Sequence, residues 1–289
     1  MKLGLHLPDL TYPDGPTRLG RDLRLIARTA EEAGFDRISV MDHLWQIQMI
    51  GPPENDMLEA YTTLGFLAAE TSSIHLMTLV TGCVYRPPGL LAKAVTTLDV
   101  LAGGRAILGI GAAWNEEEAV GLGLPFPPTA ERFERLEETL QICRAMFDGV
   151  DAPFEGRHYR LGRMLNSPAP LSRRLPILIG GSGEKKTLRL VALYGDACNL
   201  FPGPDLAHKL EVLGEHCEAV GRDVSAIEKT VLFNFDCGPN GENCHQIVES
   251  LGAMRDLGFT VAHGRVTNVH TIHPLEMIGT EILPEILEL

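Results

Sequence analysis

The residues best suited to proton transfer follow the second strand-like run of the chain. Asp42 and His43 come directly after that run, Arg37–Met41. An imidazole can take up or release a proton near neutral pH, and the neighbouring carboxylate can accept a hydrogen bond from a hydroxyl or ring of a bound molecule. An aspartate that caps the loop beside a partly exposed histidine explains the same pair. The functional interpretation is favoured if the pair lies at the active-site end of the fold.

A glycine-rich turn, Gly180–Gly183, precedes a predicted helix over Glu184–Tyr194. Such a turn presents backbone N–H groups and the positive end of a helix, which together bind phosphate. Lys185 and Lys186 add positive charge in a protein whose net charge is −13. A plain tight turn is the alternative. The pattern predicts a ligand that carries a phosphate.

Two other strand-like runs, the third and the fourth, end in residues that suit a binding site. Arg86, beside two prolines, could meet an anion, although a surface salt bridge explains it equally well. Gly111 and Ala112 are small enough to let a flat ring approach the backbone. Trp114 follows them and is predicted to form a wall of the pocket.

Eight short apolar runs alternate with helical patterns along the chain. The predicted strands are Leu3–Leu7, Arg37–Met41, Ile74–Thr81, Ala106–Ile110, Pro176–Ile179, Ala197–Phe201, Thr230–Phe235 and Thr260–Val266. The predicted helices are Leu19–Ala33, Met57–Thr71, Gly89–Leu101, Ala130–Phe147, Glu184–Tyr194, Pro204–Val220, Asn243–Leu257 and Leu275–Leu287. Eight such units predict a closed (β/α)8 TIM barrel, because the alternative, an open doubly wound sheet, usually has fewer strands.

The 289 residues are predicted to form one domain over 1–289, since such barrels commonly need about 250 residues. The interval between the fourth and fifth strands contains a segment broken by Pro and Gly, about 148–175. We expect this segment to be an insertion that covers the top of the barrel, because it contains Phe154, Tyr159 and Leu161. Active sites of these barrels lie at the carboxyl ends of the strands, where all the motifs above are placed.

Composition excludes several classes of partner. The net charge of −13 argues against binding to nucleic acid or to an anionic membrane surface. No apolar run approaches the roughly 20 residues of a membrane span, and Met1–Pro8 does not resemble a signal peptide. The six cysteines are scattered, as is typical of buried thiols in a reducing compartment. We therefore expect a soluble, cytoplasmic protein with a small-molecule substrate.

Two conspicuous clusters are interpreted as structurally ordinary. The spacing of His263, His270 and His273 fits no helical pair of metal ligands, so no metal site is expected. The run Glu116–Glu118 is interpreted as the solvated start of a helix, where the helix dipole favours acidic residues.

Five motifs, taken together in chain order, resemble the luciferase-like monooxygenase superfamily and, within it, the coenzyme F420-dependent oxidoreductases. They are Asp42-His43, Arg86-Pro87-Pro88, the stretch Leu98–Ala106, the stretch Leu108–Glu116, and Ile179–Gly183. The resemblance covers nearly the whole chain, from Leu3 to about Phe259.

This resemblance implies a barrel with an insertion after strand 4, a homodimer, and coenzyme F420 as cofactor. It also implies a cis peptide at Leu79–Val80 behind the deazaflavin ring, cofactor phosphate at Gly180–Gly183, and His43 as the catalytic residue that handles the substrate proton. The implied cofactor-binding residues are Asp42, Leu79, Val80, Thr81, Arg86, Gly111, Ala112, Gly180, Gly181, Ser182, Gly183 and Lys185. The implied substrate-pocket residues are Trp45 and Trp114.

One departure from the family pattern narrows the expected function. The sugar-phosphate dehydrogenases of this branch have a glutamate general acid just after strand 4, where Ala113 and Trp114 stand here, and Glu116 is expected to lie too far along. Two alternatives stay open: an FMN- or reduced-flavin-dependent monooxygenase of the same fold, and a barrel that binds a flavin without turnover.

Overall fold

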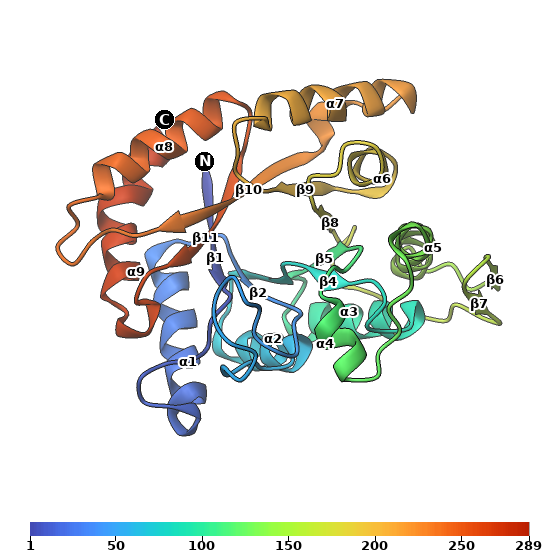
Figure 1. The fold of residues 1–289 in the computed structure, drawn as a ribbon, viewed down its shortest axis with the longest axis horizontal. Coiled ribbons are helices and arrows are strands. Elements are labelled where there is room, and N and C mark those ends of the chain that lie inside the picture. Colours follow the sequence, from blue (N-terminus) through green and yellow to red (C-terminus); the bar gives the residue numbers. More distant parts are fainter. Residues whose placement is uncertain (289) are drawn as a thin grey trace.

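Eight short apolar segments pair in parallel and close into a barrel (Figure 1). The computed structural model describes residues 1–288. The strand order is β3-β2-β1-β11-β10-β9-β8-β5-β4, and an additional pairing of β3 with β5 closes the ring. The barrel strands are β1 (Lys2–Leu7), β2 (Arg37–Val40), β3 (His75–Thr78) continued by β4 (Thr81–Gly82), β5 (Ala106–Gly111), β8 (Ile177–Gly180), β9 (Ala197–Leu200), β10 (Glu228–Phe235) and β11 (Val261–Val266). The predicted TIM barrel is confirmed.

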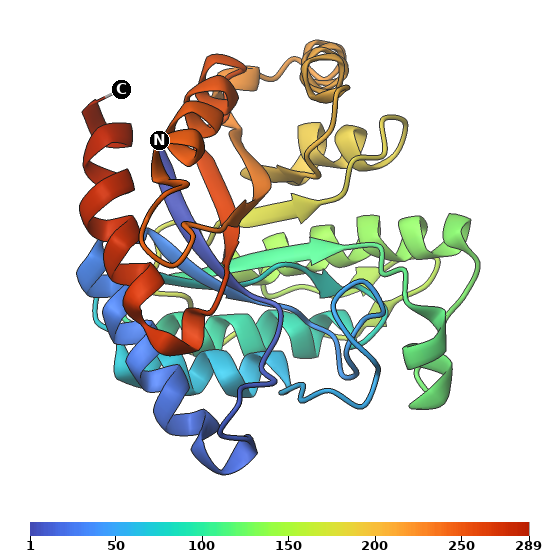
Figure 2. The same cartoon turned by 60° about the vertical axis from the view of Figure 1, so that its left-hand side comes forward.

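Helices alternate with these strands and cover the outside of the barrel (Figures 1 and 2). They are α1 (Pro16–Ala33), α2 (Ala60–Glu70), α3 (Pro88–Leu101), α4 (Glu116–Gly121), α5 (Thr129–Phe147), α6 (Thr187–Tyr194), α7 (Leu206–Ala219), α8 (Cys244–Asp256), α9 (His273–Met277) and α10 (Leu283–Glu288). In α1, buried residues recur every three or four positions, a proline begins the helix, and Gly34 ends it with a φ of 97°. A π-helical turn, Ile278–Ile282, joins α9 to α10.

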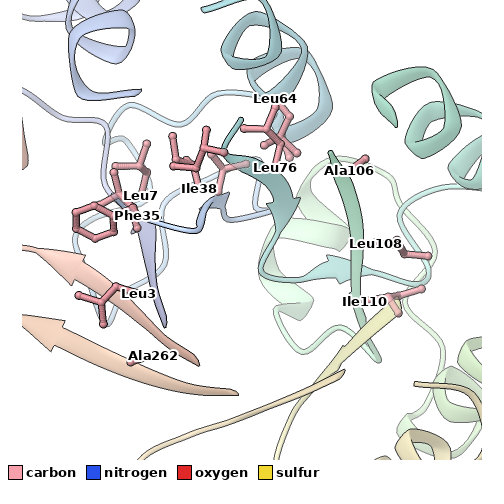
Figure 3. Close-up of a cluster of buried hydrophobic side chains, with 14 of the residues drawn as sticks. Leu3, Leu7, Phe35, Ile38, Leu64, Leu76, Ala106, Leu108, Ile110 and Ala262 are labelled. Carbon is pink, nitrogen blue, oxygen red and sulfur yellow. The ribbon is translucent and has the colours of Figure 1, made fainter. Parts of the chain in front are cut away.

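The main hydrophobic core lies between the strands and the helices. Successive side chains of a strand point to opposite faces, so alternate residues of each strand face outward. Figure 3 shows Leu76 of β3 facing Leu64 of α2, with Leu108 of β5 in the same cluster. The remaining residues face the lumen, where Met77 and Leu178 belong to a separate apolar cluster.

The third strand of the barrel is interrupted. The predicted strand Ile74–Thr81 is divided into β3 and β4 by a cis peptide between Leu79 and Val80, which confirms the position that the resemblance implied. A methyl group at Gly109 would overlap the carbonyl oxygen of Thr78. The glycine therefore lets β5 approach the end of β3 more closely than any other residue would allow.

We predict that Gly109→Ala lowers the free energy of unfolding by about 3 kcal/mol, because the added methyl must displace backbone atoms rather than a flexible side chain. Gly65→Ala is the matched control, since Gly65 lies within α2 and a methyl there would meet nothing within 4 Å. The control should be neutral or stabilising by up to about 1 kcal/mol. Urea unfolding of both variants measures the difference, and equal stabilities would contradict the close approach.

The insertion between α5 and β8 lies on the side of the barrel, which corrects the expectation that it covers the top. Its hairpin, β6 (Phe154–Glu155) and β7 (Arg160–Leu161), stands at the outer edge beside α5 (Figure 1). The Glu138 carboxylate of α5 accepts hydrogen bonds from the hairpin N–H groups of residues 157–159. Asn166 then donates to Thr96 of α3. The aromatic residues of the segment pack onto these helices instead of over the mouth.

Within residues 1–288, no helix is long and apolar enough to cross a membrane. All six cysteines are free and buried, as the sequence predicted. All six belong to the main hydrophobic core.

Candidate active site

The loops that follow the carboxyl ends of the strands gather at one mouth of the barrel. The long loop after β2, residues 41–59, and helix α4 after β5 lie at this same end (Figure 2). The structure thus places Asp42, His43, Trp45 and Trp114 at one mouth, as predicted.

His43 is held by a buried carboxylate from α4. Its Nδ1 lies 2.7 Å from Oε2 of Glu118, whose side chain is 0% exposed. Oε1 of the same carboxylate accepts hydrogen bonds from the backbone N–H groups of Leu44 and Trp45. One carboxylate therefore fixes both the imidazole and the loop that carries it. If Nδ1 carries the hydrogen, Nε2 is left to accept a proton from a bound molecule.

The same carboxylate accepts further hydrogen bonds, from the hydroxyl of Tyr85 at 3.2 Å and from Nδ2 of Asn115 at 3.2 Å. Burial alone would raise the pKa of Glu118. The hydrogen bond of His43 and the backbone N–H groups of Leu44 and Trp45 outweigh burial and hold that pKa below its ordinary value. Glu118 is therefore ionised at neutral pH.

This arrangement corrects the interpretation of Glu116–Glu118 as a solvated helix start. Glu116 and Glu117 are exposed, as expected, but Glu118 is fully buried. Glu118, one half-turn beyond Glu116, is a candidate functional residue that the sequence pattern did not indicate. Because residues i and i+2 point in different directions on a helix, the third glutamate of the run turns inward.

Asp42 and Arg86, both predicted to bind the cofactor, bind each other. The Arg86 guanidinium donates to both carboxylate oxygens of Asp42, at 2.7 and 2.9 Å, and to Glu59 at 2.5 Å. Burial raises the pKa of Asp42 to about 6, although the hydrogen bonds and the charge of Arg86 oppose the shift. Arg86 therefore binds two carboxylates of the protein itself, and the positive charge of its guanidinium is already balanced by them.

Two tryptophans border a cavity of about 280 Å³ at the mouth. The Trp114 ring meets the His43 ring edge-on, with the ring centroids 5.4 Å apart, and 56% of Trp114 is exposed. The cavity is lined by Trp45, Gln46, Gln48, Met49, Pro53, Trp114, Asn115, Glu117 and Glu118. Its position beside His43 suits a substrate pocket with aromatic walls.

The glycine turn after β8 presents unpaired N–H groups at the opposite side of the mouth. Gly181 donates to the carbonyl of Asn199 at 3.1 Å, whereas among the described residues the N–H groups of Ser182 and Gly183 meet no acceptor. Lys185 is exposed just beyond them. Helix α6 begins at Thr187 rather than at the predicted Glu184, so these groups belong to the loop before the helix.

The side chain of Val80 lies between this turn and β5. A methyl added at Gly180 would come within 2.8 Å of a Val80 methyl, and one added at Gly111 within 3.0 Å. Gly111 and Gly180, both predicted to bind the cofactor, therefore leave the space that the Val80 side chain occupies. Leu79 and Thr81 flank it in the strand, and Ala112 follows Gly111 at the mouth.

The three histidines of the C-terminal region do not converge. His263 is buried in the lumen, His270 stacks on the ring of Tyr12, and His273 is exposed. Among residues 1–288, no group of three or more His, Cys, Asp or Glu side chains is placed to hold a metal ion.

The sequence is similar to a known protein family and to individual enzymes. Residues 1–274 match the family model of the luciferase-like monooxygenases. The F420-dependent glucose-6-phosphate dehydrogenase of Kineococcus radiotolerans is 34% identical over 219 residues, which are 73% of this chain and 63% of that relative.

Solved structures share the fold. An F420-dependent secondary alcohol dehydrogenase in complex with an F420-acetone adduct superposes with a TM-score of 0.82 at 17% identity, over 99% of this chain and 98% of that one. The oxygenating constituent of 3,6-diketocamphane monooxygenase from Pseudomonas putida, in complex with FMN, superposes with a TM-score of 0.76 at 16% identity, over 98% of both chains. Together, the match over residues 1–274 and the shared barrel show that the chain belongs to the luciferase-like monooxygenase family.

Proposed function

We propose that this protein is an F420-dependent oxidoreductase that acts on a small organic substrate, with His43 as the catalytic residue. The observation that carries the proposal is the contact between His43 and the buried Glu118 carboxylate at 2.7 Å. A carboxylate that fixes one imidazole nitrogen orients the other toward the substrate and stabilises the protonated ring. A barrel that only bound a flavin would have no use for such an arrangement, so the pair argues against the non-catalytic alternative.

The residues at the mouth fit a flavin-type cofactor. When bound, the deazaflavin carries the hydride at its C5. The unpaired N–H groups of Ser182 and Gly183, with Lys185 beyond them, would hold its phosphate. The small residues of β5 and the Val80 side chain would support the ring. Asp42 and Arg86 would act as an ion pair within the protein, next in sequence to His43 through Asp42, rather than as a phosphate site.

The choice of F420 over FMN is supported by the F420-dependent relative at 34% identity. The FMN-dependent monooxygenase remains the second candidate, because the FMN-bound structure has the same barrel. Glu118 is ionised and both of its oxygens accept hydrogen bonds, so it does not replace the glutamate general acid that the sequence lacks just after strand 4. Glucose 6-phosphate is therefore not proposed as the substrate, and the substrate class is inferred from the residues at the mouth. A homodimer stays a prediction, which light scattering of the purified protein would test.

We predict that purified protein binds F420 more tightly than FMN in equilibrium titrations followed by cofactor fluorescence. Lys185→Gln should weaken F420 binding about three- to tenfold, because it removes an exposed positive charge beside the phosphate loop. Lys186→Gln is the control, since its Nζ lies 5.2 Å from the centre of the Phe133 ring. That variant should stay within about twofold of wild type. Tight FMN binding without any response to F420 would favour the monooxygenase instead.

A further inference from the structure

A row of polar side chains crosses the barrel lumen on β10, β11 and β1. Arg265 of β11 is paired in register with His6 of β1 on one side and with Asn234 of β10 on the other. Residues next to Arg265 in sequence belong to the outer core: Val266 packs there, and Gly264 contacts the ring of Phe235. Because side chains alternate along a strand, Arg265 points into the lumen.

Arg265 is exposed although it lies on a central strand, so it reaches the open mouth rather than the packed interior. Among the described residues it has no hydrogen-bond acceptor and no acidic partner. Arg37, the arginine on the lumen side of β2, is 4% exposed and is bound by Asp36 and Glu228. A guanidinium that is exposed at the end of a barrel strand and has no partner among the described residues is available to an anion.

The neighbours of Arg265 add hydrogen-bonding capacity but little charge. His6 contacts the hydroxyl of Ser39 through Nδ1 at 2.9 Å, and burial lowers the pKa of His6 to about 4, so its ring is neutral at pH 7. Asn234 is exposed at the mouth beside Arg265. This part of the wall therefore carries one positive charge with neutral donors and acceptors around it.

The row lies away from the glycine turn proposed to hold the cofactor phosphate. In the closed ring of strands, β8 is separated from β11 by β9 and β10, and from β1 by β11 as well. The cis-peptide segment at Val80 and the glycine turn both lie in the β3–β8 half of the mouth. The β10–β11–β1 half adjoins β2 and the loop that carries His43 and Trp45, so a substrate in the pocket beside His43 can extend toward Arg265.

We propose that Arg265 binds the carboxylate of a small monoanionic substrate, whose reacting group is then directed toward His43. That Arg265 binds a substrate rests on the oxidoreductase function proposed above. That Arg265 binds a carboxylate anion does not depend on that function. A guanidinium matches the two oxygens of a carboxylate with parallel hydrogen bonds. A phosphate dianion carries two negative charges, whereas Arg265 supplies one positive charge among neutral neighbours. The site therefore favours a carboxylate, which carries one negative charge.

The test uses the two tryptophans of the chain, Trp45 and Trp114, which follow β2 and β5 at the same mouth of the barrel, as fluorescence reporters of binding there. Sodium propionate and inorganic phosphate are titrated separately at constant ionic strength, and tryptophan fluorescence is followed. Wild type is expected to bind propionate saturably and more tightly than phosphate. Arg265→Gln should weaken propionate binding at least tenfold, and Arg265→Lys should weaken it less, because lysine retains the charge but not the paired donors.

Arg160→Gln is the matched control. Its side chain is 80% exposed on the β6–β7 hairpin, far from the mouth in Figure 1, and the variant should bind propionate within about twofold of wild type. All variants should unfold at the same urea concentration as wild type, which excludes a loss of fold as the cause.

Separate titrations with F420 distinguish this inference from the proposed function. Unchanged F420 affinity of Arg265→Gln, with weakened propionate binding, supports the inference. If wild type does not bind F420, the proposed function is wrong. The propionate titrations still decide whether Arg265 binds a carboxylate. Arg265 does not bind a substrate carboxylate if propionate affinity is unaffected by Arg265→Gln, if phosphate binds more tightly than propionate, or if the variant loses F420 affinity instead.

Discussion

Glu118→Gln is expected to lower turnover by about 10²- to 10³-fold. Glutamine keeps the size of the side chain but removes the charge that stabilises a protonated imidazole, and its amide can favour the wrong tautomer of His43. The measurement is kcat with any donor or acceptor that supports turnover in wild type, followed by the absorbance of F420. The same substitution should lower the free energy of unfolding by about 3 kcal/mol, since the N–H groups of Leu44 and Trp45 lose a charged acceptor.

A double-mutant cycle separates the catalytic effect from the structural one. His43→Ala alone should reduce turnover at least as much as Glu118→Gln, and the double variant should be no slower than His43→Ala, because the carboxylate acts through the imidazole. Glu116→Gln, an exposed residue two positions away, should leave turnover and stability unchanged within about 0.5 kcal/mol. Additive losses in the double variant would show that Glu118 does not act through His43.

The barrel could be predicted because its signals are local and repeated. Each barrel strand is a short apolar run, and helices such as α1 and α5 are long enough to show a helical period. Helix α4 was expected only as a helix start at Glu116–Glu118, and its buried face was not predicted, because its six residues, Glu116–Gly121, carry no apolar face of useful length. The hairpin at Phe154–Leu161 was seen as an apolar segment, but its position on α3 and α5 depends on tertiary contacts such as those of Glu138.

The site could be predicted less completely, for two different reasons. Position after strand 2 was enough to single out His43 as a candidate, and resemblance rather than periodicity located the cis peptide at Leu79–Val80. The partner of His43 could not be found in the same way, because the direction of one glutamate in a run of three depends on where the helix begins. Arg86 was equally ambiguous, since its partner Glu59 comes from an irregular loop whose path the sequence does not indicate.

A polar lumen has a consequence for stability in acid. His263 is 0% exposed, and within the described part of the chain neither ring nitrogen has a hydrogen-bond partner. Burial, helped by the charges of Arg37 and His6, lowers the pKa of His263 well below 6.5. The folded state therefore keeps this ring neutral at pH values where the unfolded chain takes up a proton. The free energy of unfolding therefore decreases as the pH falls below 6.5, because the unfolded chain takes up a proton that the buried ring does not. His6, with a pKa of about 4 in the folded protein, adds to this decrease between pH 6.5 and 4.

His263→Leu is expected to reduce this acid sensitivity. At pH 5 the unfolded histidine is protonated and costs wild type about 2 kcal/mol, since each pH unit below 6.5 contributes about 1.4 kcal/mol. Leucine has a similar volume and no nitrogen to leave unpaired, so the variant should be at least as stable as wild type at pH 7.5. Its advantage, measured by urea unfolding, should grow by about 2 kcal/mol between pH 7.5 and pH 5.

The matched control is His245→Gln, whose wild-type side chain is 83% exposed in α8. An exposed surface side chain contributes little to stability, so this substitution should change the free energy of unfolding by less than about 0.5 kcal/mol at either pH. If His263→Leu showed the same difference from wild type at both pH values, the buried ring would have to be taking up its proton in the folded state. The acid sensitivity of the protein would then have to come from other buried groups, such as His6.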